Sequence, residues 1–166
     1  MKLGVSDSFR GRADAAAYWE AWTGAVLSRA GLYTEHYPFH ISEGPGGIDY
    51  SQTWDLNVSK RGGPYTEVEV KSVNLTFTSV QDYPMRDVMV CSQNSFLRKW
   101  PGKAAIGRDF LFVSRITGNI VWLPKHSPIS VGHETYDRER GETYKTVHAR
   151  KADLRDLSDF LEYIIG

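Results

Sequence analysis

The sequence predicts an α/β protein of the α+β type, in which helices pack against a mixed sheet. Apolar residues recur at spacings of three and four between positions 14 and 30 and again between 152 and 165, which is typical of helices. Between positions 66 and 71 valines alternate with charged residues, which indicates a strand. The predicted order is a helix, a three-strand meander, a second helix, further strands and a C-terminal helix.

Length and composition indicate one soluble domain covering residues 1–166. A chain of 166 residues can bury about 70% of the surface of its unfolded form. The hydrophobic content of 41% and charged content of 24% are those of a globular protein, and no apolar run reaches membrane-spanning length. The N-terminus lacks the apolar core of a secretory signal, and the lone Cys91 excludes an internal disulfide. We therefore expect a cytoplasmic protein with no membrane partner.

The first predicted helix spans residues 14–30, with Asp14 as its N-cap and Gly31 as its terminator. Helical spacing predicts a buried stripe of Trp19, Trp22, Val26 and Ala30. Glu20 lies off that stripe among small neighbours, which leave its carboxylate room to approach another element. An ordinary solvated glutamate is the alternative interpretation.

Three strands are predicted to follow this helix. They cover residues 33–41, 52–58 and 66–71. The Gly-rich segment 42–47 between the first two either closes over a substrate or is a plain connector. The segment 59–64 has the composition of a tight turn, so the second and third strands should form a hairpin that lays Asp55 beside Glu69.

The third strand carries the most informative pattern in the chain. Glu67, Glu69 and Lys71 project from one face, while the intervening Val68 and Val70 project into a core. Charged groups next to a core need partners such as a metal ion, a phosphate or water. Paired acids supply the oxygen ligands that Mg²⁺ prefers, whereas soft ligands are missing, since Cys91 is the only cysteine.

Asp55, followed on the next strand by Glu69-Val70-Lys71, resembles the motif of the PD-(D/E)xK nuclease superfamily. The resemblance covers residues 14–123, and Glu20 stands where many members carry a glutamate in the first helix. Trp54 departs from the pattern, because it replaces the proline of the motif. The resemblance implies a restriction-endonuclease-like core, a Mg²⁺ cofactor that Mn²⁺ would replace, and hydrolysis of DNA phosphodiester bonds.

The same resemblance assigns roles to individual residues. The implied catalytic set is Glu20, Asp55, Glu69 and Lys71. The metal ion would be held by Asp55, Glu69, the carbonyl of Val70 and, through water or at a second ion, Glu20, while Lys71 would orient or deprotonate the attacking water. A second helix is predicted at 92–100, and Gln93 is its candidate for a polar residue directed at the site. Glu67 is either accessory or an ion-pair partner outside the site.

The charge distribution bears on DNA as a partner. With 20 basic and 20 acidic residues the chain has no general attraction for nucleic acid, although its basic residues are clustered. The residues expected to contact DNA are Lys60, Arg61, Arg98, Lys99, Trp100 and Lys103. The alternatives are that the basic residues are ordinary solvated surface charges and that Trp100 lies in the core.

The remainder of the chain should complete the sheet. Strands are predicted at 109–117 and 119–123, an extended loop at 124–142, and an edge strand at 144–148. His126, His133 and Glu134 in the loop fit no closed set of zinc ligands, so no zinc site is predicted there. The C-terminal helix at 152–165 should direct inward Leu154, Leu157, Phe160, Leu161 and Ile164.

The resemblance to the PD-(D/E)xK superfamily implies a Mg²⁺-dependent DNA endonuclease that acts on junctions or branched DNA, or on a specific sequence. Because cutting two strands needs two sites, we expect a homodimer or a higher homo-oligomer. The competing hypothesis is a module of the same fold that binds nucleic acid or a protein without cutting, which the zero net charge supports. If these residues have no catalytic role, they form a charged face on an edge strand, in which Lys71 balances the acids.

Overall fold

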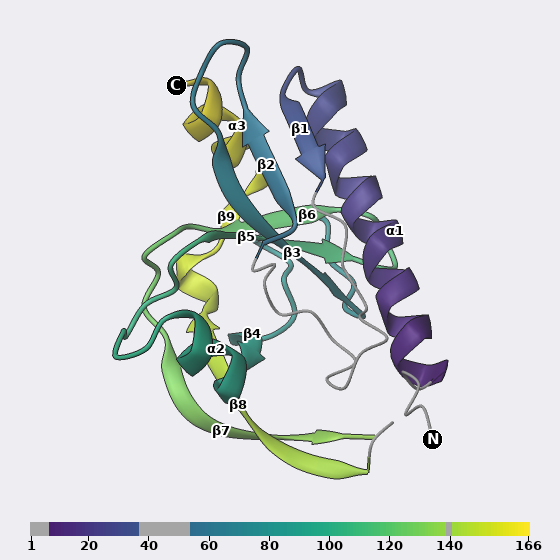
Figure 1. Cartoon of the computed structure of the whole chain (residues 1–166), viewed down its shortest axis with the longest axis vertical. Coiled ribbons are helices and arrows are strands. Elements are labelled where there is room, and N and C mark those ends of the chain that lie inside the picture. Colours follow the sequence, from purple (N-terminus) through teal and green to yellow (C-terminus); the bar gives the residue numbers. More distant parts are fainter. Residues whose placement is uncertain (1–6, 37–53, 139–140) are drawn as a thin grey trace, which may run out of the picture.

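The computed structural model describes residues 7–36, 54–138 and 141–166, with side chains from residue 14 onward. A mixed sheet of six strands in the order β1-β2-β3-β5-β6-β9 forms its centre (Figure 1). The strands are β1 (Tyr33–His36), β2 (Leu56–Ser59), β3 (Thr66–Val73), β5 (Asp109–Ser114), β6 (Ile120–Leu123) and β9 (Arg155–Asp156). Strands β3 and β5 are parallel, and every other pair in this sheet is antiparallel. The predicted α/β class with a mixed sheet is confirmed.

A second, three-stranded antiparallel sheet was not predicted. Its order is β4-β8-β7, formed by β4 (Asp87–Ser92), β7 (Ser130–Asp137) and β8 (Glu142–Arg150). The prediction of a loop over residues 124–142 is therefore wrong, because residues 130–137 form β7. The strand predicted at 144–148 is longer than expected, and it lies in the centre of its sheet and not at an edge. Strand β7 was not predicted because its half-buried positions hold the polar residues His133, Thr135 and Asp137, so its sequence lacks the apolar alternation of a strand.

Two apolar cores lie on opposite faces of the six-stranded sheet. Strand β5 is buried along its whole length and supplies both, as expected for a strand covered on both faces. Leu111 and Val113 pack in the core beneath α1 (Asp7–Arg29) and α3 (Leu157–Ile165). Phe110 and Phe112 pack in the core shared with the small sheet and with α2 (Gln93–Lys99). The molecule thus has three layers, with helices α1 and α3 on one side of the sheet (Figure 1).

Helix α1 differs from its prediction in start and in orientation. It begins at Asp7, so Asp14 lies within the helix and does not cap it, whereas Gly31, with a φ of 93°, ends it as predicted. The fully buried side chains in its described part are Thr23 and Leu27, while Trp22 is 40% exposed and Ala30 is exposed. The indole of Trp22 donates a hydrogen bond of 2.9 Å to the carbonyl of Gly118, which lies between β5 and β6. Trp22 is therefore at the rim of the contact between α1 and the six-stranded sheet.

The two other helices are close to their predictions. In α2, Ser92 caps the N-terminus, and its hydroxyl accepts a hydrogen bond of 3.2 Å from the amide of Ser95. Helix α3 is shorter than predicted, because residues 155–156 pair with β6 instead of continuing the helix. Phe160 is fully buried and Leu157, Leu161 and Ile164 pack against the same core, which confirms the predicted inward face. Leu154, also buried, joins the core on the other side of the sheet.

Some predictions fall on residues that the structure does not describe. They are the end of the strand at 33–41, the Gly-rich segment 42–47, and residues 52–53 of the second strand.

The hairpin predicted at 109–123 is present as β5 and β6. Within residues 7–36, 54–138 and 141–166, no helix has the length and apolar character needed to cross a membrane.

Candidate active site

The hairpin of β2 and β3 brings Asp55 to the middle of β3. In the register of this pair Leu56 lies opposite Val68, and the amide of Asp55 extends the ladder with a bond of 3.0 Å to the carbonyl of Val68. The side chain then turns back, and its Oδ2 accepts a hydrogen bond of 2.8 Å from the amide of Val70. Asp55 is thus held against the backbone between Glu69 and Lys71, as the predicted hairpin requires.

Glu20 reaches the same place from α1. Its side chain is hydrogen-bonded to that of Asp55, and both carboxylates interact electrostatically with Lys71. The helix therefore turns Glu20 toward the sheet, on the side of Thr23 and Leu27, and not away from the buried stripe as its spacing suggested. The alternative of an ordinary solvated glutamate does not describe this side chain.

The two acids share a proton. Burial, followed by the charge of Asp55 and the hydrogen bond to it, raises the pKa of Glu20 to about 8, against the opposing effect of Lys71. Burial also raises the pKa of Asp55, with a contribution from Glu69, while the amide of Val70 lowers it. Two carboxylates this close do not both ionise easily unless a positive charge joins them. The proton lies on Glu20, which donates it to Asp55.

Glu69 forms the other side of the site. Only 4% of this residue is exposed, and its Oε1 forms an ion pair with the ammonium of Lys99 at the end of α2. Its Oε2 lies 4.0 Å from Nη1 of Arg108, is buried, and has no hydrogen-bond partner. A buried carboxylate oxygen without a donor is costly, and a cation would compensate it. Lys71 from the same strand is half-buried and acts on Glu20 and Asp55.

These residues fit a hard divalent cation that keeps part of its water shell. Among the residues that the structure describes, Glu20, Asp55 and Glu69 do not gather all three ligand oxygens within 4.8 Å. Mg²⁺ is usually bound by one or two carboxylates and retains several waters. An ion of this kind would need only two of the three carboxylates as direct ligands.

Two other predicted residues, Gln93 and Lys99, have different partners from those expected, and Glu67 has one of its expected partners. Gln93 does not point to the carboxylates, because its Oε1 accepts a hydrogen bond of 3.2 Å from the amide of Gly132 in β7. The residue that α2 contributes to the site is Lys99, which had been assigned to DNA. Glu67 pairs with Arg108 at 3.0 Å, in agreement with an ion-pair role outside the site. Helical spacing offers no signal for Lys99, since its partner lies on a distant strand.

The residues predicted to contact DNA divide into two groups. Lys60, Arg61, Arg98 and Lys103 are exposed. Trp100 is half-buried and packs edge-on against Phe96 and Phe110, with ring centroids 5.4 and 6.1 Å apart, so it belongs to the rim of the core. Stacking of this indole on an extruded base would require it to leave those contacts.

The chain was compared with proteins that are already known. No protein-family model, curated protein or solved structure matches it. Its chemistry is therefore inferred from its own residues and their arrangement.

The shared proton makes stability depend on pH. Between the ordinary pKa of 4.5 and the folded value of about 8, Glu20 keeps its proton in the folded state and loses it in the unfolded state. Stability must then fall as pH rises through this window. In EDTA at pH 8, Glu20→Gln should raise Tm by about 2–4 °C, the effect of roughly 1 kcal/mol after solvent screening. Thermal melts from pH 5 to pH 8.5 measure it.

The control for this experiment is Glu35→Gln, which neutralises an exposed acid on β1. This variant should follow the wild-type pH profile. A wild-type Tm that stays level or rises across the window, in the absence of divalent cations, would contradict the shared proton.

Proposed function

We propose that this chain is a Mg²⁺-dependent DNA endonuclease of the PD-(D/E)xK type. The observation that carries the proposal is the position of Asp55, whose carboxylate is bound to the amide of Val70 between Glu69 and Lys71 and is joined there by Glu20. The order of elements also supports it. Helix α1, the antiparallel meander β1-β2-β3, helix α2 and a strand, β5, parallel to β3 occur in the order that the resemblance implies, with β4 of the small sheet inserted between β3 and α2.

The chemistry divides between the cation and the chain. A bound Mg²⁺ would lower the pKa of the water that it binds and would neutralise charge on the phosphate. Asp55 and Glu69 would hold the ion, and the Val70 carbonyl would be available as a further ligand. Lys71, which acts electrostatically on Glu20 and Asp55, would orient the attacking water and offset the negative charge that develops on the phosphate. Glu20 would hold the ion through water or at a second ion.

The proposed partner is DNA, which would be bound through exposed lysine and arginine side chains. Lys60 and Arg61 are exposed in the turn that joins β2 and β3, and Lys103 is exposed beyond the end of α2. Because the net charge is zero, binding would depend on these local groups and weaken steeply with salt. A homodimer that presents two sites to the two strands belongs to the same proposal.

A non-catalytic module is the competing function, and the ion pair of Lys99 with Glu69 favours it. In such a module the lysine would replace the cation permanently and the site would be a closed charge network. The two functions differ in a single measurable property, which is hydrolysis that depends on a divalent cation.

A nicking assay tests the proposal. Supercoiled plasmid, linear duplex, single strands and a four-way junction are incubated with the wild type in Mg²⁺, in Mn²⁺ and in EDTA. We expect cleavage in either metal and none in EDTA, with a loss of about 10²–10⁴-fold in Lys71→Ala. Lys145→Ala, an exposed lysine of β8, should cleave like the wild type. No cleavage of any substrate by the wild type would establish the module instead.

Lys99 provides a separate prediction, because its ammonium competes with the cation for Glu69. Lys99→Met should tighten Mg²⁺ binding at pH 8.5 by about fivefold, the equivalent of roughly 1 kcal/mol for such an ion pair. Isothermal titration calorimetry with Mg²⁺ measures the effect. Lys103→Met, at an exposed position near the end of α2, is the matched control and should bind as the wild type does. Weaker binding in Lys99→Met would mean that the lysine supports the ion.

A further inference from the structure

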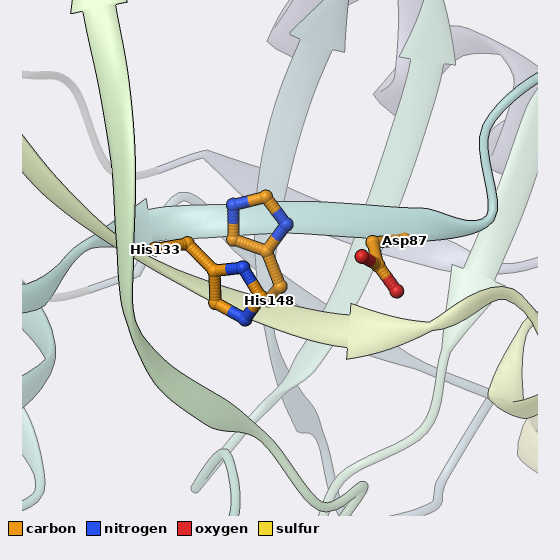
Figure 2. A group of neighbouring side chains, drawn as sticks. All are labelled: Asp87, His133 and His148. Atoms are coloured by element: carbon orange, nitrogen blue, oxygen red, sulfur yellow. The ribbon is translucent and has the colours of Figure 1, made fainter.

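The small sheet carries a second cluster of metal-ligating side chains, one from each of its strands. Asp87 comes from β4, His133 from β7 and His148 from β8 (Figure 2). One ligand atom from each of the three lies within 4.8 Å of the other two, the only such group among the residues that the structure describes. This cluster shares no residue with the acids of the candidate active site.

The hydrogen bonds of His148 leave one ring nitrogen free to act as a ligand. Its Nε2 lies 2.8 Å from the hydroxyl of Thr146, and that hydroxyl lies 3.2 Å from the carbonyl of His133, to which it donates. Since Nε2 is engaged by this hydroxyl, Nδ1 is the ring nitrogen that is left for another ligand. That Nδ1 is buried and has no hydrogen-bond partner.

His133 is held beside His148 by contacts of the same kind. Its Nε2 lies 2.8 Å from the hydroxyl of Ser130, and the two imidazole rings are stacked with centroids 4.2 Å apart and planes inclined by 23°. Burial, followed by the neighbouring His133, lowers the pKa of His148, against the effect of Asp87. Two rings at this distance are favoured as neutral groups, which is the form that binds metals. In metal sites a hydrogen bond to the second ring nitrogen fixes the orientation of a ligating histidine.

Asp87 completes the cluster at an open edge. It is exposed, and together with Ser130, His148 and Arg150 it lines a pocket of about 300 Å³. An ion can therefore enter, and water can reach any coordination position that the protein leaves unfilled. Two imidazoles and a carboxylate are a ligand set for borderline ions such as Zn²⁺, whereas Mg²⁺ prefers oxygen ligands alone.

We propose that Asp87, His133 and His148 form a second metal site, which binds Zn²⁺ and leaves its remaining position to water. Since each ligand belongs to a different strand, the ion links β4, β8 and β7 across the whole small sheet. Its effect is to stabilise this sheet, which has one exposed polar strand, β7. The sequence concealed the site because the ligands are far apart along the chain. Glu134, considered with His133, is exposed and lies opposite Lys145.

Zinc binding by the full chain tests this proposal. Metal-free protein is equilibrated with Zn²⁺ in excess Mg²⁺, and the zinc retained is measured by mass spectrometry together with Tm. We expect the wild type to retain about one equivalent and to gain in Tm. His133→Ala and His148→Ala should each weaken zinc binding by at least about tenfold and lose the gain in Tm.

Two controls separate this site from the active site and from its own neighbours. Asp55→Asn alters the acids around β3, and Glu134→Gln changes an exposed acid of β7; both should retain zinc as the wild type does. If a histidine variant fails to fold, Asp87→Asn at an exposed position replaces it and should also lose zinc. The proposal is overturned if the wild type retains no zinc, if the histidine variants retain it unchanged, or if only Asp55→Asn loses it.

Discussion

The Asp55→Asn variant is expected to lose Mg²⁺-dependent DNA cleavage by about 10³-fold, which corresponds to roughly 4 kcal/mol of transition-state stabilisation. Asparagine keeps an oxygen that can accept the hydrogen bond of the Val70 amide, which in the wild type is 2.8 Å long. The backbone of the hairpin should therefore remain in place. What is lost is one of the two charges proposed to hold the ion. Single-turnover cleavage of labelled DNA at saturating protein measures the change.

The same substitution has a second consequence, which distinguishes loss of the metal ligand from misfolding. Without the charge of Asp55, one of the causes that raise the pKa of Glu20 is removed. In EDTA the variant should thus show a weaker pH dependence of Tm than the wild type. Glu67→Gln is the matched control, since this residue projects from the same strand but pairs with Arg108. Cleavage by Asp55→Asn at the wild-type rate would refute the proposed role.

The Phe112→Ala variant is expected to reduce the free energy of unfolding by about 3–5 kcal/mol. Phe112 has an exposed fraction of 0% and its ring stacks on that of Phe110, with centroids 6.1 Å apart. It lies in β5, whose side chains pack against both neighbouring layers, so a cavity here cannot be closed by one layer moving. Urea denaturation followed by tryptophan fluorescence measures the loss.

Ile116→Ala is the control for this variant, because Ile116 is 58% exposed in the turn after β5. A surface substitution of this kind should change stability by no more than about 0.5 kcal/mol. A loss below about 1 kcal/mol in Phe112→Ala would mean that the core beneath the small sheet repacks easily, contrary to the close-packed interior described above.

The strands and helices that bury a regular apolar pattern were predictable from the sequence. The alternation in 66–71 and the turn at 59–64 before it placed Asp55 beside Glu69, and β5 and β6 followed from their apolar runs. Local periodicity did not predict which side of α1 faces the sheet, because tertiary contacts determine that orientation. Glu20 faces the sheet because the helix packs through Thr23 and Leu27, whereas the tryptophan at 22 is directed to Gly118 at the rim.

The charge partners within the site could not be predicted, because they connect elements that are distant in sequence. Lys99 and Glu69 belong to α2 and β3, and no spacing rule relates them. The same is true of Asp87, His133 and His148, which become neighbours only through the order of strands in the small sheet. Polar strand β7 is stabilised by its backbone pairing with β8, and its composition resembles that of a loop.

The parallel pairing of β3 with β5 determines how quickly the chain can reach its native state. These strands are adjacent in space, but β4 and α2 separate them in sequence. The intervening segment must be gathered into a closed loop before the pairing returns any favourable energy. Refolding from denaturant should accordingly be slow compared with that of helical bundles, and its rate-limiting event should be the arrival of β5 beside β3.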